Sequence, residues 1–452
     1  MELSKAQRYA TVMVMMLGVF IALLNQTLLT TALPGIMTSF NLSLDSAQWL
    51  TTIFMLVNGI MIPISAYYTT RFSSKSLYLT AIGLFILGTL LCLVAPYFWL
   101  LLLGRAVQAI GAIGAGILIP LIQVVLLVAF PLEERGAAMG IFGLVTGFSP
   151  AIGPTLSGWI LSYYSWQAIF MIVLVAMLIN IVISIAVVKN VTTTGPADLD
   201  LLSVVLSTFA FGGLLYGFSK ASRMGFTNPT IVLLLIASFV ALTVYFKRQK
   251  QLPTPMLNTS VLRVKAFVHA CLIIMVMFMI FNASMTLMPI YIQNIRGLTA
   301  LQSGLLLLPG GLLMGILAPI TGRLFDKIGG KPFAVLGMLL IVVSSLFLSR
   351  LDAQSTSLTI SFLFSMLMTG NALILTPLTT SAMNALPLSL IPHGSAMNSA
   401  TRQLFAAIGT AIFVSLMGTK ASLEQGFQFT YQAIAGLAFL GLFLALSLPR
   451  KH

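Results

Sequence analysis

The sequence predicts an all-α polytopic membrane protein with fourteen transmembrane helices, arranged as six, two and six. Three observations lead to this prediction. Of the 452 residues, 59% are hydrophobic and only 7% are charged, whereas a soluble protein needs about 25% charged residues to cover its surface. Apolar runs of about 20 residues, each long enough to cross about 30 Å of hydrocarbon, recur from end to end. Short motifs from the first part of the chain return in its last part.

The fourteen predicted spans are separated by short loops. An even number of spans places both termini on one side of the membrane. That side holds most of the lysines and arginines, and the opposite loops hold only Lys220, Arg223, Arg296, Arg350 and Lys420. Because basic loops stay in the cytoplasm, we expect both termini there. The spans are 10–36, 47–69, 76–95, 98–128, 136–161, 167–188, 201–219, 228–246, 267–293, 302–323, 332–350, 357–382, 394–418 and 427–447.

The charge and the cysteines exclude other classes. The net charge of +14 comes mostly from short loops between spans, so it indicates membrane topology and anionic lipid headgroups, and we expect no nucleic acid partner. Cys92 and Cys271 lie inside apolar runs and imply no disulfide framework. The first apolar run is too long for a cleaved signal peptide.

An internal repeat divides the chain. Arg135-Gly-Ala-Ala-Met139 matches His393-Gly-Ser-Ala-Met397 about 258 positions later, and three further matches follow at nearly the same offset. We therefore predict a six-helix half at 1–190, two inserted helices with their linkers at 191–264, and a second six-helix half at 265–452. Two halves related by an axis along the membrane normal are typical of a rocking transporter with its binding site between them. The further matches pair Pro34 with Pro289, Pro63-Ile64 with Pro319-Ile320, and Ile117 to Pro120 with Ile374 to Pro377.

The stretch RGAAMGIFGLVTGFSPAIGPTLSG, from Arg135 to Gly158, is apolar but rich in glycine and proline. That content would break a soluble helix. In lipid, neighbouring helices re-satisfy the freed backbone groups, and small residues let backbones approach closely. We expect a bent helix whose glycines lie against the matching helix of the other half. The alternative is a glycine-rich packing helix with no other role.

Two further motifs carry charge. In Gly322 to Lys331, Asp326 is flanked by Lys327 and followed by Gly329, a pattern that predicts a charge latch between adjacent helices. The copy in the first half has Ala66, Thr70 and Ser73 in place of the two glycines and the aspartate, but keeps Arg71 and Lys75.

Arg105 and Gln108 lie within a span, where a charged residue costs about 2.5–3.5 kcal/mol and usually faces a cavity or a partner. The alternative for Arg105 is an arginine that snorkels to the membrane interface.

These motifs resemble those of the major facilitator superfamily. The Gly322 loop is similar to its cytoplasmic GxLxDRxGRR motif, and Arg105 to Gly111 is similar to its RxxQG motif. Pro150, Gly153, Pro154 and Gly158 resemble the antiporter motif of the fourteen-span drug:proton antiporters. Asn25 to Leu29, the Tyr-Ser-Trp166 turn and His393 to Gln403 resemble the lincomycin and multidrug efflux branch.

The resemblance implies the major facilitator fold and a function. It implies export of lipophilic drugs across a bacterial cytoplasmic membrane by alternating access, coupled to proton influx. Small-molecule drugs, protons and the lipid bilayer would be the partners of a monomeric protein without a cofactor or metal. No enzyme motif is present: HExxH, GxSxG and a nucleotide-binding glycine loop are absent from the sequence. The alternatives are a lipid or fatty-acid flippase of the same fold, and a receptor or scaffold that does not transport.

The proton carrier is an open question in the sequence. The nine acidic residues all lie in loops or at span ends, and Asn25 stands where many members of that family carry an aspartate. Asparagine cannot titrate. His393 at the start of span 13, Asp200 before span 7 and Asp45 before span 2 are the candidates. A histidine at a helix start is more often a capping residue, and an uncoupled or differently coupled carrier is the remaining alternative.

Polar residues within spans of both halves predict the substrate cavity. Some of them would instead make hydrogen bonds between helices. Because Arg105 and Arg402 have no buried acid among them, we expect a neutral to positive cavity that prefers neutral, zwitterionic or anionic amphiphiles over permanent dications. The set consists of Asn25, Gln26, Thr27, Asn58, Arg105, Gln108, Gln123, Ser149, Asn282, Asn371, Asn398, Arg402 and Gln403.

Overall fold

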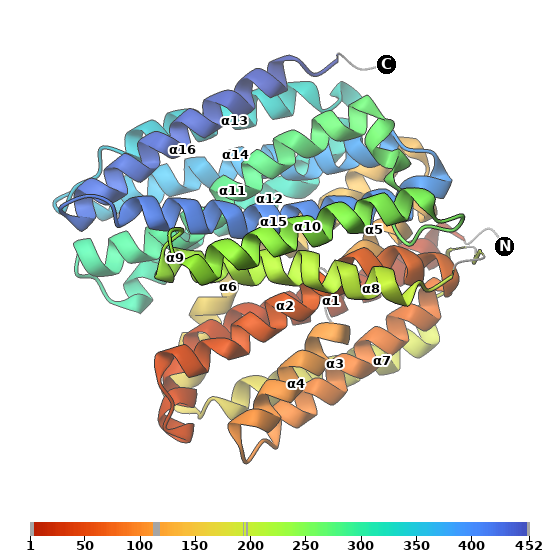
Figure 1. Cartoon of the computed structure of the whole chain (residues 1–452), viewed down its shortest axis with the longest axis horizontal. Helices are drawn as coiled ribbons and strands as arrows, with labels where there is room; N and C mark the ends of the chain where they lie inside the picture. The colour runs from red at the N-terminus through yellow and green to blue at the C-terminus, as the bar shows by residue number, and fades with distance from the viewer. Residues whose placement is uncertain (1–3, 112–117, 193, 196–197, 450–452) are drawn as a thin grey trace.

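The computed structural model describes residues 4–111, 118–192, 194–195 and 198–449, and within them the chain is helical without strands. Figure 1 shows three groups of helices. The N-terminal bundle comprises α1 (Lys5–Phe40), α2 (Leu44–Arg71), α3 (Ser74–Leu93), α4 (Phe98–Gly111), α5 (Leu118–Ala129), α6 (Arg135–Tyr163) and α7 (Gln167–Val187). The insertion comprises α8 (Leu201–Ser207), α9 (Gly213–Met224) and α10 (Pro229–Gln251). The C-terminal bundle comprises α11 (Lys265–Ile290), α12 (Ala300–Ile328), α13 (Lys331–Leu348), α14 (Ser357–Asn384), α15 (Ile391–Met417) and α16 (Leu423–Leu446).

Local chemistry sets where the helices begin and end. The Ser73 side chain caps α3, and Thr299 forms a capping box with Gln302 at the start of α12. The same helix ends at Gly329, whose φ of 78° is a left-handed conformation that glycine adopts without strain. The latch sequence therefore lies at the end of α12, as a loop-forming glycine there predicts.

The all-α polytopic fold is confirmed. Among the described residues, eleven helices are long and apolar enough to cross a membrane, and a twelfth is α6, which bends by 44° between Pro150 and Thr155. A proline inside a helix removes one hydrogen bond and is a common cause of such a bend. The apolar helices α4 and α5 are shorter, and residues 112–117 between them lie outside the described part. The count of fourteen spans therefore stays a prediction.

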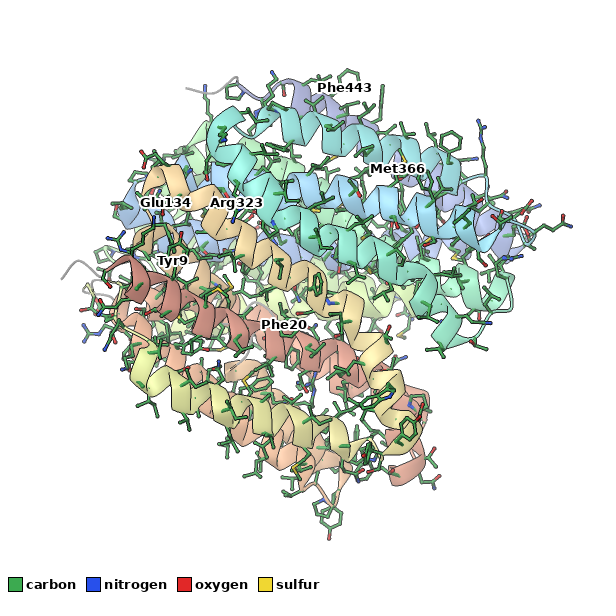
Figure 2. All side chains as sticks on the ribbon, turned by 180° about the vertical axis from the view of Figure 1, so that it is seen from behind. Tyr9, Phe20, Glu134, Arg323, Met366 and Phe443 are labelled. Carbon is green, nitrogen blue, oxygen red and sulfur yellow. The ribbon has the colours of Figure 1, made fainter. Side chains whose placement is uncertain are left out.

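The two bundles meet along two seams. In one, α6 packs along α12; in the other, α2 packs along α15. Glu134 and Arg323, near the start of α6 and the end of α12, lie close together in Figure 2. The insertion, green in Figure 1, covers the α2–α15 seam, where α9 packs on α15 and the π-helical turn Thr208–Gly212 packs on α2. Leu214, Leu215 and Phe218 of α9 form a hydrophobic cluster with Leu404, Ala407 and Ala411 of α15.

The prediction that the glycine-rich helix lies against its matching helix is wrong, because α6 lies against α12 and not against α15. The physical reason is the twofold relation that the repeat predicts. Exchanging the halves maps α6 onto α15 and α12 onto α2, so the α6–α12 contact recurs as α15–α2. A helix would meet its own counterpart only if it lay on the symmetry axis.

The glycines of α6 face two different neighbours. A Cβ atom on Gly140 would lie 2.7 Å from the Cα of Pro319, and one on Gly147 would lie 3.0 Å from the Cα of Gly315, so α6 and α12 touch backbone to backbone. Further along α6, Gly153 of the antiporter motif faces Thr27 of α1, and a Cβ on Gly158 would meet open space. The close seam therefore covers the first half of α6, and the antiporter motif lies beyond it.

Candidate functional site

One end of the molecule joins the two bundles through polar contacts. We call it the terminal face, because the start of α1 lies there: Lys5 Nζ is 3.8 Å from Glu134 Oε1, just before α6. At this end Arg135 Nη1 donates to Asn384 Oδ1 at the end of α14, at 3.2 Å. Ser395 Oγ, near the start of α15, donates to Gln123 Oε1 of α5 at 2.7 Å. The last two bonds each connect the N-terminal bundle to the C-terminal bundle.

Asp326 makes the strongest of these contacts. Its Oδ1 accepts from Gly136 N at 2.9 Å and its Oδ2 accepts from Ala137 N at 3.1 Å. The first amides of a helix have no partner within it, and the helix dipole favours a negative charge beside them. Glu134 makes no side-chain cap for α6. A carboxylate from the C-terminal bundle therefore caps a helix of the N-terminal bundle.

The other predicted latch residues lie around this cap. Gly322 sits against the backbone of Gly136, where a side chain would collide. Lys331 Nζ donates to Leu448 O at 2.6 Å, a contact within the C-terminal bundle. Lys327 and Gly329 close α12, and Arg71 is exposed at the end of α2. Asp326 thus bonds through its side chain to the other bundle, and Gly322 contacts the same helix of that bundle.

His393 lies at the second seam. Its Nδ1 accepts a hydrogen bond from Asn258 N at 3.2 Å, so this nitrogen carries no proton in the structure. It lines a cavity of about 120 Å³ between α2, the linkers of the insertion and α15. Thr70, which the repeat aligns with Asp326, is part of the same wall. The full lining is Ala66, Tyr67, Thr70, Asp198, Thr254, Pro255, Met256, Asn258 and His393.

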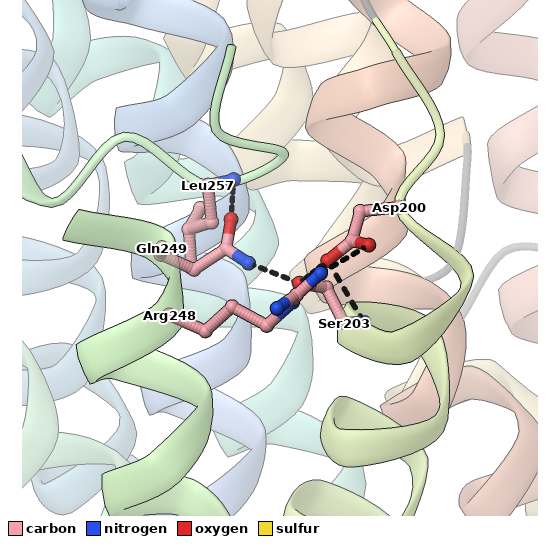
Figure 3. Close-up of polar contacts among 5 residues, drawn as sticks. All are labelled: Asp200, Ser203, Arg248, Gln249 and Leu257. Atoms are coloured by element: carbon pink, nitrogen blue, oxygen red, sulfur yellow. Dashed lines mark hydrogen bonds and ion pairs between the residues drawn. The ribbon is translucent and has the colours of Figure 1, made fainter. Parts of the chain in front are cut away.

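Asp200 is bound in an ion pair within the insertion (Figure 3). Arg248 donates to its two oxygens through Nε at 2.6 Å and Nη2 at 2.8 Å. These bonds hold the pKa of the Asp200 carboxyl well below its usual range. A carboxylate that stays ionised at neutral pH is poorly suited to carry a proton, so the geometry favours a structural clamp.

The clamp continues toward the second seam. Ser203 joins Asp200 to Gln249, whose Nε2 donates to Ser203 Oγ at 2.6 Å, and Gln249 Oε1 accepts from Leu257 N at 3.1 Å. The next residue, Asn258, donates to His393. A chain of hydrogen bonds therefore runs from the start of α8 to the start of α15. The third carrier candidate, Asp45, is in the first turn of α2, but its side chain lies outside the described residues, as does that of Pro154.

Arg105 is buried and donates hydrogen bonds to two acceptors. Its Nε donates to Leu50 O at 3.3 Å, and its Nη1 donates to Gln108 Oε1 at 2.8 Å. Gln108 Nε2 in turn donates to Thr89 Oγ1 at 2.7 Å. The guanidinium carbon is 4.2 Å from the centroid of the Phe54 ring. This arrangement ties α4 to α2 and α3 and lines none of the described cavities.

Arg402 has a similar aromatic contact, but it lines a cavity and lacks the hydrogen bonds of Arg105. It lines a cavity of about 90 Å³ to which both bundles contribute, α5 on one side and α11 and α15 on the other. Its guanidinium carbon lies 4.3 Å from the centroid of the Phe278 ring. Its buried Nε and Nη1 have no hydrogen-bond acceptor within the described part of the chain. The lining is Ile119, Phe278, Phe281, Asn282, Ser399, Arg402, Gln403 and Ala406.

The remaining predicted residues fall into two groups. Thr27 and Ser149 join α1 to α6, because Thr27 Oγ1 lies 3.4 Å from Ser149 O and Ser149 Oγ lies 3.4 Å from Phe20 O. Asn25 and Asn58 are buried with both amide atoms unpartnered among the described residues. Asn371 Oδ1 and Asn398 Nδ2 are also unpartnered there, and Gln26 is half-buried. A buried unpaired amide costs about 1–3 kcal/mol, which water or a ligand would recover.

The structure thus brings together Asn282, Arg402 and Gln403 of the predicted cavity. The predicted set omits the residues beside them. Ser399, Arg402, Gln403 and Ala406 have the spacing of one helix face, and Phe278 and Asn282 are four residues apart. Residues three or four positions from Asn282, Arg402 and Gln403 share their helix faces, so this spacing predicts Phe278, Ser399 and Ala406 as neighbours.

The bundles, the close seam and the polar cavity between them are those of a membrane transporter. The chain belongs to the Major Facilitator Superfamily, whose family model matches residues 15–410. It is 42% identical to the uncharacterized MFS-type transporter YcnB of Bacillus subtilis (strain 168), over 98% of this chain and 96% of that protein. It is 39% identical to the lincomycin resistance protein LmrB of the same organism, over 91% of this chain and 86% of that protein.

A solved structure has the same fold. The proton:xylose symporter XylE matches with a TM-score of 0.71 and 14% identity, over 99% of this chain and 97% of that chain. The family consists of transporters, so the chain is a transporter and not an enzyme.

Proposed function

We propose that this transporter exports lipophilic small molecules, antibiotics among them, by alternating access between residues 1–190 and residues 265–452. The 37–39% identity to lincomycin resistance proteins over about nine tenths of the chain supports the substrate class. The observation that carries the mechanism is the Asp326 cap. It joins the two bundles through two hydrogen bonds at one end of a glycine-packed seam, a contact that can form and break as a unit.

The basic loops support a cytoplasmic position for the terminal face and for both termini, in a bacterial cytoplasmic membrane. In this orientation the polar contacts of Asp326, Arg135 and Ser395 close the cytoplasmic side. Opening of the other side would follow from the divergence of α6 and α12 beyond Gly147.

Proton influx would drive export, with His393 as the proton acceptor. Protonation of Nδ1 abolishes the hydrogen bond from Asn258 N and places a charge at the cytoplasmic end of the α2–α15 seam. The seam would then loosen on that side. Asp200 is excluded from this role by its ion pair with Arg248.

The test is transport by the purified chain in proteoliposomes with an imposed proton gradient. We expect lincomycin or another lipophilic antibiotic to move against its gradient and to cause proton flux in the opposite sense. Antibiotic movement without proton flux would contradict coupling, and no antibiotic movement under any gradient would contradict the export function.

A lipid flippase is the second candidate, because one surface groove fits a lipid chain. The groove of about 1120 Å³ lies at the ends of α12, α13, α14 and α16 and has apolar walls that include Leu336, Leu339 and Leu378. Fluorescent lipid added to the same proteoliposomes decides between the two functions. Movement of lipid between the leaflets, without antibiotic transport, would identify the flippase.

A further inference from the structure

Arg402 has a cationic group for which the described residues supply no hydrogen-bond acceptor. Its buried Nε and Nη1 are unpartnered, and no described acidic side chain lines its cavity. Removing a charge from water is costly unless it is paired and hydrogen-bonded. Arg105 has neutral hydrogen-bond acceptors in Leu50 O and Gln108 Oε1. Arg402 has no such acceptor within the described part of the chain, so a molecule that enters the cavity would supply it.

The cavity favours an anion over water alone. Asn282 and Gln403 add amide groups to its wall, and the remaining lining is neutral. The Phe278 ring covers one face of the guanidinium at 4.3 Å, which leaves the donors at the edge of the plane for an acceptor. A planar guanidinium edge matches a carboxylate, with which it forms charge-assisted hydrogen bonds.

The size of the cavity limits what can enter. About 90 Å³ corresponds to about three waters at about 30 Å³ each, whereas a drug-sized ligand needs about 300–1,000 Å³. The cavity therefore admits a head group and one adjoining apolar segment in this conformation. Phe281 and Ile119 supply apolar surface beside the charge, and Ile119 comes from the opposite bundle.

We propose that Arg402 binds the carboxylate of lipophilic organic acids, and that these acids are a substrate class of the transporter. The inference rests on the proposed export function and names its substrate. Because Ile119 closes the cavity from α5 while Arg402 holds the head group from α15, separation of the bundles opens the cavity and releases the acid. An inorganic anion such as chloride shares the charge but not the apolar part.

The test is equilibrium binding of radiolabelled naphthoate to the purified full chain in detergent, with methyl naphthoate and chloride as competitors. Arg402→Gln removes the charge, and Arg402→Lys keeps the charge but loses the planar donor edge. Lys420→Gln is the matched control, because Lys420 is an exposed cation over an aromatic ring, Phe429, at 4.1 Å. Lincomycin export by each variant is measured in parallel.

We expect Arg402→Gln to weaken naphthoate binding by about tenfold to 100-fold, the value of charge-assisted hydrogen bonds, and Arg402→Lys to weaken it less. Lys420→Gln binds as the wild type does, and the methyl ester does not compete. Equal naphthoate binding by Arg402→Gln and the wild type would overturn the proposal. The proposal would also be overturned if chloride and the methyl ester displaced the labelled naphthoate as effectively as unlabelled naphthoate does.

The two proposals fail in different ways. A wild-type chain that exports lincomycin but binds no naphthoate contradicts the role of Arg402 and leaves the export function in place. A chain that binds naphthoate through Arg402 but exports no lincomycin contradicts the antibiotic export function and leaves the carboxylate site at Arg402 in place. If Arg402→Gln is not recovered as a folded protein, the comparison of Arg402→Lys with the wild type decides the same question.

Discussion

The two seams between the bundles would be equivalent if the repeat were perfect, yet they are built differently. In the α6–α12 seam, Gly140 and Gly147 bring the two backbones into contact. At the offset of about 258, Gly140, Gly143 and Gly147 correspond to Asn398, Thr401 and Phe405 of α15. These positions of α15 carry larger residues than the glycines of α6, and the insertion covers this second seam.

The ends of the two seams differ in the same way. Asp326 caps α6 at the first seam, and Thr70 stands at the equivalent position of the second. There the start of α15 bonds through His393 to Asn258 of the insertion linker. The comparison teaches that a carboxylate closes one seam and an imidazole closes the other.

The largest effect is expected from filling the close seam. Gly140→Leu places a side chain where Pro319 Cα lies 2.7 Å from the Cβ position, so α6 and α12 cannot keep their contact. Overpacking of this kind costs about 1–3 kcal/mol, and we expect transport to fall by about tenfold or more. Drug efflux from cells and thermal unfolding of the purified protein measure the two effects. Gly83→Leu in α3 is the control, because its Cβ position has no neighbour within 4 Å; equal losses in both variants would contradict this role of the seam.

Removal of the fixed charge comes next. Asp326→Ala deletes the cap of α6, which is worth about 1–2 kcal/mol, and opens the first seam at the terminal face. We expect faster labelling of a cysteine placed at Asn384 by a thiol reagent applied from the side of the terminal face. Adding Thr70→Asp to the same variant offers a carboxylate to the start of α15 and should slow the labelling again. Unchanged labelling of Asp326→Ala would show that the cap does not hold the gate.

The titratable group should affect pH dependence more than maximal rate. His393→Asn keeps a side-chain acceptor for Asn258 N but cannot bind a proton. We expect export driven by a proton gradient to lose pH dependence, because the variant has no titratable side chain at this position. Drug-dependent proton flux in proteoliposomes measures this. A pH profile identical to that of the wild type would exclude His393 as the carrier.

The smallest effect is expected at the clamp behind the second seam. Asp200→Asn removes an ion pair that is partly exposed, so we expect a loss of about 1 kcal/mol in unfolding free energy and no change in the pH profile of export. Because the pKa of Asp200 is lowered in the folded state, its contribution is complete above about pH 4 and is lost as the pH falls further. Thermal melts at several pH values measure it. A shifted export profile in this variant would return Asp200 to the list of proton carriers.

The sequence predicted the features of the fold that depend on its internal repeat and on the length of its apolar runs. The all-α membrane fold, the family and the place of the latch at the end of α12 follow from apolar run length, spaced motifs and a glycine at a helix end. The partner of α6 could not be predicted from the match of α6 with α15, because a repeat says which helices are alike and not which ones touch. That choice depends on where each helix lies relative to the symmetry axis.

The two arginines show a second limit. Arg105 and Arg402 are equally unusual in an apolar sequence, but their roles depend on which acceptors surround them. Arg105 donates hydrogen bonds to Leu50 O and Gln108 Oε1. Every residue has a backbone carbonyl, so the residue type at position 50 does not indicate that its carbonyl accepts from Arg105. Asp200 is similar, since its partner Arg248 lies 48 residues later. Pairing of this kind is a property of the folded chain.

The four tryptophans of the chain, Trp49, Trp99, Trp159 and Trp166, all belong to the N-terminal bundle. Trp49 stacks on Tyr216 of the insertion, and the indoles of Trp99 and Trp159 are largely exposed. The tryptophan fluorescence of the native protein therefore comes from the N-terminal bundle, and the C-terminal bundle contributes none. A single quencher attached to the C-terminal bundle would make this fluorescence depend on the distance between the two bundles. The fluorescence would then measure their relative movement without any change to the tryptophans.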